Sequence, residues 1–238
     1  MELLAAGARK LLNLELTSQQ LAAFQIYADE LVRWNQQFNL SGITDGAGIQ
    51  VKHFLDSLSI LAVMPPGSGP QRVVDVGTGA GFPGLPLKIV RPELALTLVE
   101  ATGKKVDFCQ AVVDRLGLKD VSVLKARAED LGQDPAQREQ YDWALARAVA
   151  EMAVLAEYLL PLARLGGHAL AQKGPNAPPE TEAAAGALAK LGGAVEQIVP
   201  VELPGLEDKR YLVILKKIAP TPAAYPRRAG MPSKRPLV

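Results

Sequence analysis

Four glycines lie within eight residues, from Gly77 to Gly84, directly after the short apolar run Arg72–Val76. Glycine adopts positive φ angles without a steric penalty and lets the backbone come close to another molecule. In an open parallel sheet, ligands bind at the carboxyl ends of the strands, where such a loop would lie. The stretch therefore predicts a ligand-binding loop after the first strand of an α/β domain.

Apolar runs of strand length alternate with stretches of helical periodicity around and beyond this loop. This alternation is typical of βαβ units, in which helices cover both faces of a parallel sheet and the strands need no polar side. Two last runs have no helical pattern between them, which predicts a closing antiparallel pair. The predicted fold is a doubly wound, Rossmann-like α/β domain. Its predicted strands are Arg72–Val76, Ala95–Val99, Val121–Leu124, Asp142–Ala146, Gly167–Ala171, Ala194–Val201 and Tyr211–Lys216, and its predicted helices are Thr102–Leu116, Ala150–Leu165 and Glu180–Leu191.

The chain divides into three parts on this interpretation: a helical extension over residues 1–68, the α/β domain over 69–218 and a tail over 219–238. Thr17 and Ser18 are good N-cap residues for one helix of the extension. A second helix is predicted from about Gly48 to Val63, ended by Pro65-Pro66-Gly67. The tail is rich in proline and carries basic residues but no acid, so we expect it to form no packed element of its own.

The composition predicts an ordinary globular protein, because 48% of the residues are hydrophobic and 21% are charged. No apolar stretch approaches the roughly 20 residues that span a bilayer, and we expect a cytoplasmic protein without membrane contact. With one cysteine, Cys109, and two histidines, His53 and His168, a zinc site is not expected. We also expect a monomer. The net charge of +1 gives no sign of a nucleic-acid partner.

Two readings of the glycine loop predict different ligands. Gly79-x-Gly81-x-x-Gly84 matches the dinucleotide-binding pattern and would indicate an NAD-type oxidoreductase. Pro83 disfavours this reading, because it falls where a dinucleotide fold is already helical. The earlier register, Asp75-x-Gly77-x-Gly79-x-Gly81, ends the strand on a carboxylate. A carboxylate there suits a cationic amino acid group better than a pyrophosphate, which favours S-adenosylmethionine, a ligand with an ammonium, a sulfonium and no phosphate.

Further candidate cofactor residues follow the next two strands. Glu100 ends the second strand, where a carboxylate can bind both ribose hydroxyls, and Ala101 and Thr102 follow beside the expected adenine ring. After the third strand, the Ala128 and Glu129 pair could present a backbone N–H and a carboxylate to the adenine edge. Singly, each acid is better explained as a solvated loop charge or a helix cap. Carboxylates at three successive strand ends together favour the ligand. Phe82 could pack over it or lie in the core below the loop.

Several motifs, in order along nearly the whole chain, resemble the bacterial small-subunit rRNA guanine-N7 methyltransferases, the RsmG family, formerly called GidB. They are Trp34-Asn35, Asn39-Leu40, His53–Ser57, Asp75–Pro86, Arg147-Ala148, Lys173-Gly174 and Arg210–Val213.

This resemblance implies a class I S-adenosylmethionine-dependent methyltransferase that methylates N7 of a guanosine in 16S rRNA. It places the cofactor residues at Gly77, Phe82, Ala128, Glu129 and Arg147, with the segment Glu100-Ala101-Thr102 close by. The chain departs from the family at two of its positions: Glu100 stands where Asp is common and Tyr211 where His is often found.

The expected chemistry needs no general base, because guanine N7 carries an exposed lone pair and the enzyme has only to position it. Arg147, at the end of the fourth strand, is the candidate positioning residue and could bind the cofactor carboxylate or the nucleotide. An ion pair with Glu151 would explain Arg147 equally well. Cys109 is expected to be a buried structural thiol rather than a nucleophile, and His53 and Trp34 are expected to be packing residues.

Local basic residues support an RNA partner, either 16S rRNA or the small ribosomal subunit, and the tail is expected to contact phosphate. For any single pair of these residues, a solvated surface with balancing acids is the better explanation. A methyltransferase for another nucleic acid or a small molecule, and a non-catalytic RNA-binding module with the same fold, remain alternatives. The candidate RNA-binding residues are Lys173, Arg210, Arg227, Arg228, Lys234 and Arg235.

Overall fold

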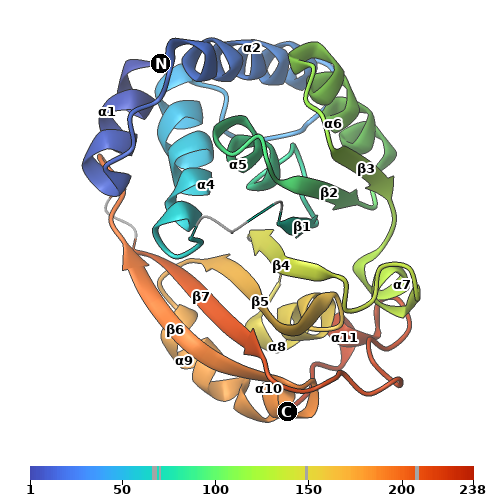
Figure 1. The fold of residues 1–238 in the computed structure, drawn as a ribbon. Coiled ribbons are helices and arrows are strands. Elements are labelled where there is room, and N and C mark those ends of the chain that lie inside the picture. The colour runs from blue at the N-terminus through green and yellow to red at the C-terminus, as the bar shows by residue number, and fades with distance from the viewer. Residues whose placement is uncertain (66–68, 70, 148–149, 207–208) are drawn as a thin grey trace.

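A seven-stranded sheet forms the centre of the computed structural model, which describes residues 1–65, 69, 71–147, 150–206 and 209–238 (Figure 1). The strand order is β3-β2-β1-β4-β5-β7-β6, with β7 antiparallel to both of its neighbours and the other pairs parallel. The doubly wound fold and its closing antiparallel pair are confirmed. The strands are β1 (Arg72–Val76), β2 (Ala95–Glu100), β3 (Val121–Lys125), β4 (Tyr141–Arg147), β5 (Ala163–Lys173), β6 (Gly193–Val201) and β7 (Arg210–Lys217).

Helices cover both faces of the sheet, and each face has its own hydrophobic core (Figure 1). The N-terminal helices pack with α5 and α6 on one face, and α7, α8 and α10 pack on the other. No described helix is long and apolar enough to cross a membrane. The helices are α1 (Glu2–Leu12), α2 (Ser18–Asn35), α3 (Gly46–Gly48), the π-helix η1 (Ile49–Leu55), α4 (Asp56–Leu58), the 3₁₀-helix η2 (Ser59–Ala62), α5 (Gly84–Val90), α6 (Gly103–Leu116), α7 (Ala128–Gln133), α8 (Met152–Leu159), α9 (Ala177–Ala183), α10 (Ala185–Lys190) and α11 (Met231–Lys234).

Some predicted boundaries differ from the structure. The helix predicted to continue to Leu165 ends at Leu159, because Pro161 has no N–H with which to continue the helical hydrogen bonds. The helix predicted over Glu180–Leu191 is two short helices that meet at Ala184. Pro66, Gly67 and Ala148, which belong to predicted motifs, lie outside the described residues, as does the boundary at residue 68.

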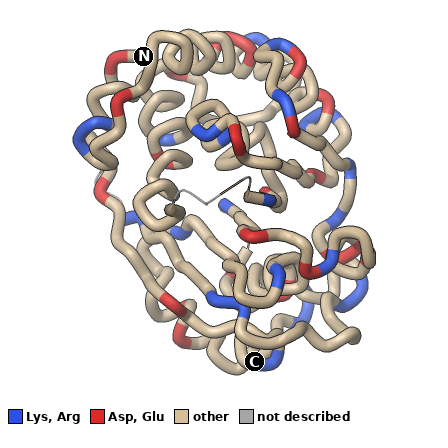
Figure 2. Tube along the Cα trace, in the orientation of Figure 1, with Lys and Arg blue, Asp and Glu red and all other residues tan. Residues whose placement is uncertain are grey.

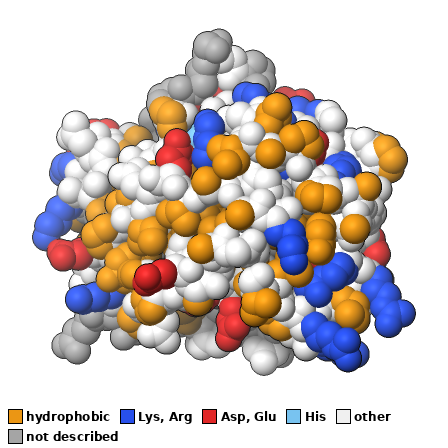
Figure 3. All heavy atoms as spheres, turned by 90° about the horizontal axis from the view of Figure 1, so that it is seen from below, with side chains coloured by type: hydrophobic (Ala, Val, Ile, Leu, Met, Phe, Trp, Pro, Cys, Tyr) orange, Lys and Arg blue, Asp and Glu red, His pale blue; other side chains and the backbone are white. Residues whose placement is uncertain are grey.

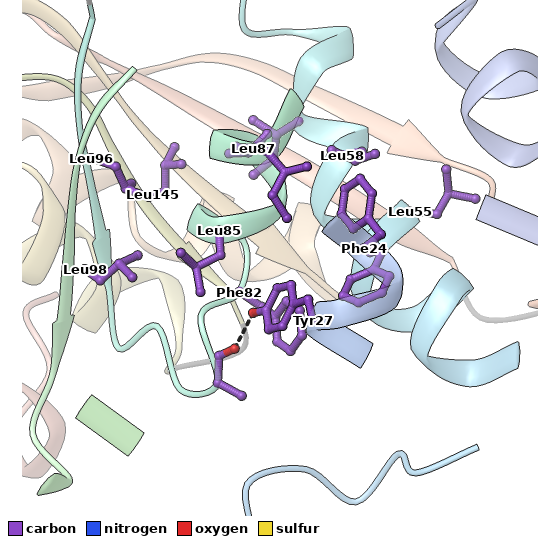
Figure 4. Close-up of a cluster of buried hydrophobic side chains, with 14 of the residues drawn as sticks. Phe24, Tyr27, Leu55, Leu58, Phe82, Leu85, Leu87, Leu96, Leu98 and Leu145 are labelled. Atoms are coloured by element: carbon purple, nitrogen blue, oxygen red, sulfur yellow. Dashed lines mark hydrogen bonds between the residues drawn. The ribbon is translucent and has the colours of Figure 1, made fainter. Parts of the chain in front are cut away.

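The helical extension packs directly against the glycine loop. Thr17 caps α2 through a reciprocal pair of hydrogen bonds with Gln20, which confirms this predicted helix start. Tyr27 of α2 is fully buried, stacks on Phe82 at 5.4 Å and donates a hydrogen bond to the carbonyl of Ala80 (Figure 4). The extension therefore supports the loop at the carboxyl end of β1.

The prediction that residues 219–238 form no packed element is wrong. The guanidinium of Arg138 donates to the carbonyls of Thr221 at 2.6 Å and Tyr225 at 2.7 Å. The amide of Gln133 donates to the carbonyl of Pro226 at 2.7 Å, and the segment contains the short helix α11 beside α8 (Figure 1). A proline-rich chain leaves its carbonyls without regular partners, and donors of the α/β domain satisfy them here.

Candidate active site

The glycine loop leaves β1 with Gly77, Gly79 and Gly81 at φ angles of 68°, 61° and 89°. A Cβ at Gly79 would meet nothing within 4 Å, so this part of the loop borders open space. At Gly81 a Cβ would lie 2.6 Å from the Tyr27 hydroxyl and would also overlap Leu85. The loop therefore borders open space at Gly79. At Gly81, the absence of a Cβ allows Tyr27 of α2 to pack closely against the loop.

Asp75 has a structural role in addition to the predicted ligand contact. It is fully buried, and its Oδ2 accepts hydrogen bonds from the Gly84 N–H at 2.8 Å and the Thr78 hydroxyl at 2.5 Å. Burial raises the pKa of this carboxyl to about 6. The other oxygen, Oδ1, is buried without a hydrogen-bond partner among the described residues. An unsatisfied buried carboxylate oxygen is costly, and a cationic ligand group would satisfy it.

The same contact disfavours the dinucleotide reading of the loop. In dinucleotide-binding folds the pyrophosphate lies at the N-terminus of the helix that follows the loop. In this protein α5 begins at Gly84, and its first N–H is already bound by the Asp75 carboxylate. A negative charge of the protein thus takes the place that a pyrophosphate would need.

Glu100 links the glycine loop to the end of β2. Its Oε2 accepts a hydrogen bond from the Gly79 N–H at 3.0 Å, and its Oε1 accepts one from the Thr102 N–H at 2.8 Å. Each carboxylate oxygen keeps a second lone pair, which could accept a hydroxyl donor.

A cavity of about 200 Å³ lies at the carboxyl ends of β1, β2 and β3. The glycine loop, Glu100 and the start of α7 border it. The cavity gathers the predicted residues Gly77, Glu100, Ala101, Ala128 and Glu129, and it is also lined by Tyr158, Gly230 and Ser233.

Phe82, His53 and Arg147 form a stack at the end of β4. The His53 ring lies 4.5 Å from the Phe82 ring, nearly parallel to it, and the Arg147 guanidinium lies 4.8 Å from the Phe82 centroid. Arg147 Nη2 lies 3.3 Å from His53 Nδ1. Because a guanidinium only donates, Nδ1 accepts, and the Nε2–H of His53 donates to the Ser41 hydroxyl at 2.7 Å. Burial and the charge of Arg147 lower the pKa of His53 to about 4, so the ring is neutral.

The carboxylate partner of Arg147 among the described residues is Asp56, at 3.1 Å, rather than Glu151. Arg147 also donates to the carbonyl of Lys52 at 3.2 Å. Both partners belong to the N-terminal helices, so the positions of Arg147 and of the extension depend on each other.

A second cavity, of about 230 Å³, lies beside this stack at the ends of β4, β5 and β7. Lys52, Arg147, Lys173 and Arg210 give it a basic lining. Lys173 is not free for a ligand, because it pairs with Glu180 at 2.6 Å and donates to the carbonyl of Ala150 at 2.7 Å.

Two polar atoms of the second cavity have no hydrogen-bond partner among the described residues: the buried Nε of Arg210 and the buried Oε1 of Gln172. The cavity thus offers one unpaired donor and one unpaired acceptor, in addition to the guanidinium of Arg147.

The four basic residues of the tail do not act as a group. Arg227 binds the fully buried carboxylate of Glu157 through its Nη2 at 2.7 Å, so its charge is neutralised inside the protein. Arg228, Lys234 and Arg235 are exposed. Basic and acidic positions alternate along much of the chain in Figure 2, whereas Lys and Arg side chains gather toward the right of the face in Figure 3, the side of α7 and the tail.

The interpretation of Cys109 and Trp34 as packing residues is confirmed. Cys109 is fully buried, and burial raises the pKa of its thiol. Trp34 packs against Phe38 and Phe108 at ring distances of 5.8 Å and 5.7 Å. Neither residue lines the two cavities.

Two contributions to the site were not predicted from the sequence. Asp56 belongs to a recognised motif, yet nothing in the sequence paired it with Arg147. Tyr158, Gly230 and Ser233 line the first cavity from segments that were assigned to a core helix and to a free tail. One feature of the sequence could have indicated this contact: the tail carries basic residues but no acids. Such residues can pair with a buried acid elsewhere in the chain.

The strand order, the glycine loop and the acids at the carboxyl ends of β1, β2 and β3 define a class I S-adenosylmethionine-dependent methyltransferase. Comparison with solved structures agrees with this fold: a 16S rRNA adenine-N1 methyltransferase from Catenulisporales acidiphilia superposes with a TM-score of 0.52 over 64% of this chain and 87% of its own, at 17% identity.

The chain belongs to the family described as "GidB: rRNA small subunit methyltransferase G", whose model matches residues 20–210. Among similar sequences, the ribosomal RNA small subunit methyltransferase G of Roseiflexus castenholzii is 53% identical over 226 residues, which cover 95% of each chain. The protein of the same name from Pelotomaculum thermopropionicum is 48% identical over 236 residues, 99% of this chain and 98% of its own.

Proposed function

We propose that this protein transfers a methyl group from S-adenosylmethionine to N7 of a guanosine in 16S rRNA. The observation that carries the proposal is family membership over nearly the whole chain, combined with a glycine loop whose surroundings suit this cofactor. Relatives of the same length carry the name of a small-subunit rRNA methyltransferase. The N7 position and the guanosine follow from the resemblance described above.

The residues around the loop fit S-adenosylmethionine. The unpaired Oδ1 of Asp75 would accept the ammonium group, and Glu100 would bind the ribose hydroxyls. Ala128 and Glu129 would meet the adenine edge in the first cavity. When bound, this cofactor supplies an electrophilic methyl group on a sulfonium.

The second cavity fits an RNA base on the other side of Arg147. Besides the paired Arg147 and Lys173, its lining carries Lys52 and Arg210, which suit a phosphodiester chain. Its unpaired polar atoms on Gln172 and Arg210 suit a base that offers both donors and acceptors. Guanine N7 attacks through a free lone pair, so no proton has to leave first. The neutral His53 and the Asp56-bound Arg147 would therefore position the base rather than remove a proton.

The proposal is tested by methyl transfer from labelled S-adenosylmethionine to small ribosomal subunits that lack their own modification, with the modified nucleotide identified by mass spectrometry. We expect N7-methylguanosine at one 16S rRNA position. A different methylated nucleotide would refute the N7 assignment. Cofactor binding without transfer to any form of the subunit or its RNA would refute the substrate.

A further inference from the structure

The first cavity has an outer wall that comes from the C-terminal segment. Gly230 and Ser233 line it together with Gly77 and Glu100, although they lie more than a hundred residues further along the chain. Figure 1 shows this segment running past α7 to α11, beside the carboxyl ends of the central strands. The segment is thus a neighbour of the cofactor residues as well as of the surface.

Two hydrogen bonds tie the segment to residues of the cavity itself. The Gly230 N–H donates to Glu129 Oε1 at 2.8 Å, and the hydroxyls of Ser233 and Tyr158 lie 2.9 Å apart. Glu129 is buried and is the residue expected to meet the adenine edge. One carboxylate therefore serves both the C-terminal segment and the cofactor pocket.

A buried ion pair fixes the segment just before this wall. Glu157 of α8 has no exposed surface, and it accepts hydrogen bonds from the backbone N–H of Arg227 at 2.8 Å and from its Nε at 2.9 Å. On the other side of the chain, Pro226 packs against Gly132, where an added Cβ would lie 2.7 Å from the proline ring. A segment held in this way cannot act as a loose polycation.

From these contacts we infer that Gly230 and Ser233, together with Tyr158 of α8, are part of the S-adenosylmethionine site and that this part of the C-terminal segment closes its adenine end. The inference rests on the proposed cofactor-dependent function and extends it to a part of the chain beyond the matched family range of residues 20–210. Gly230 holds Glu129 in place for the adenine amino group, while Ser233 and Tyr158 form the outer rim. Binding of the cofactor then further stabilises the segment in this position, as linkage requires.

The test measures binding of S-adenosylhomocysteine by calorimetry. A truncated protein that ends at Ala229 keeps Arg227 and its buried partner Glu157 but loses the wall. Ser233→Leu keeps the whole segment and adds a bulky apolar side chain at the rim, so it decides the matter if the truncated protein does not fold. The matched control replaces the exposed Arg228, Lys234 and Arg235 with alanine and leaves the wall in place.

We expect the truncation to weaken S-adenosylhomocysteine binding at least tenfold and Ser233→Leu at least threefold, with wild-type affinity in the triple-alanine control. Wild-type affinity in the truncated protein and in Ser233→Leu would overturn the inference while leaving the proposed function intact. Failure of the wild-type protein to bind S-adenosylhomocysteine would overturn both.

A second measurement uses the trypsin sites of the segment itself. Trypsin can cut after Arg228 and Lys234, which are exposed, whereas Arg235 precedes a proline. Saturating S-adenosylhomocysteine should slow both cuts at least threefold and leave cleavage after the distant, exposed Arg33 unchanged. Equal rates with and without ligand would contradict closure by this segment.

Discussion

Arg147 belongs to β4, yet its contacts come from the N-terminal helices and from the ring of Phe82. Its side chain and that of Asp56 are 15% and 11% exposed, so both charges are largely removed from water. Removing one partner of such a pair leaves the other charge unpaired, which costs more than the pair contributes. The residue that we expect to position the base is therefore also part of the packing between the extension and the sheet.

Replacing Arg147 with alanine should lower turnover about a hundredfold, the scale associated with a misplaced reacting group. Loss of the guanidinium frees the His53 ring and removes the positive charge beside the second cavity. Single-turnover kinetics with S-adenosylmethionine and the RNA substrate would measure the effect. Arg164→Ala is the control, because Arg164 forms an exposed ion pair with Asp142 away from both cavities. Unchanged turnover together with unchanged cofactor affinity would exclude a role for Arg147.

Asp75 predicts how cofactor binding depends on pH. Its pKa is raised to about 6 by burial, from an ordinary 3.8, so protonation in the folded protein begins near neutrality. A raised carboxyl pKa favours the folded state at low pH, and this contribution is lost as the pH rises through 6. The ligand needs the opposite form, because only the ionised Oδ1 attracts an ammonium group.

We expect the affinity for S-adenosylhomocysteine to fall as the pH drops from 7 to 5. Protonation of Asp75 over the same range should not lower the free energy of unfolding. Asp75→Asn retains an acceptor for the Gly84 N–H but should bind the ligand about tenfold more weakly at pH 7, since a hydrogen bond to a charged group is worth about 1.5–3 kcal/mol. Calorimetric titrations at several pH values would show a flat profile for this variant. A wild-type profile that is equally flat would contradict the assignment.

At the scale of elements, the glycine loop is held between α2 and the open edge of the sheet. Gly79 and Gly81 have similar left-handed φ angles but different surroundings. Backbone strain alone costs an alanine about 1–2 kcal/mol at either position. Only at Gly81 does a Cβ also meet Tyr27 and Leu85, which are buried.

Gly81→Ala should therefore lower the free energy of unfolding by about 1–3 kcal/mol more than Gly79→Ala, the added range being that of an overpacked core. Urea unfolding of the two single variants gives the comparison directly. The pair is its own control, because the strain is shared and the overlap is not. An equal loss of stability in both variants would contradict this prediction. It would mean that α2 moves to accommodate the added methyl group at no cost.

At the scale of the whole molecule, the N-terminal helices and the C-terminal segment, which are far apart in the sequence, both flank the carboxyl edge of the sheet. The N-terminal helices support the glycine loop through Tyr27 and hold Arg147 through Asp56. The C-terminal segment reaches the far side of the same edge and is anchored at Glu157. The site is thus closed by both ends of the chain, while the central domain supplies the loop and the acids.

The ion pair between Arg227 and Glu157 should contribute to the free energy of unfolding of the whole protein. Arg227→Ala leaves the carboxylate of Glu157 buried without its partner and should lower the free energy of unfolding by about 3–5 kcal/mol. Arg227→Ala combined with Glu157→Gln should recover part of this loss, because the remaining side chain is uncharged. Arg228→Ala, at the exposed neighbour, should change stability by less than about 0.5 kcal/mol. A loss as small for Arg227 as for Arg228 would argue against a fixed segment.

The sequence by itself determined the seven strands and their order along the chain, the glycine loop and the acids at the carboxyl ends of three strands. These features depend on residues close together in the chain: apolar periodicity sets the elements, and parallel strands bring their carboxyl ends to one edge whatever the details of packing. For this reason the positions of Gly77, Glu100 and Glu129 at successive strand ends sufficed to group them, and the three residues do lie around one cavity.

Only the tertiary structure decided which partner each charge has. Arg147 had a carboxylate four residues away, yet it pairs with Asp56, 91 residues earlier. Arg227 was expected to meet phosphate, yet it pairs with Glu157 across 70 residues. A charged side chain can reach many partners, and the free energies of the alternatives differ by little until burial removes water from one of them. Burial is a property of the assembled cores, so these pairings, and with them the wall of the cofactor cavity, were not contained in any local pattern.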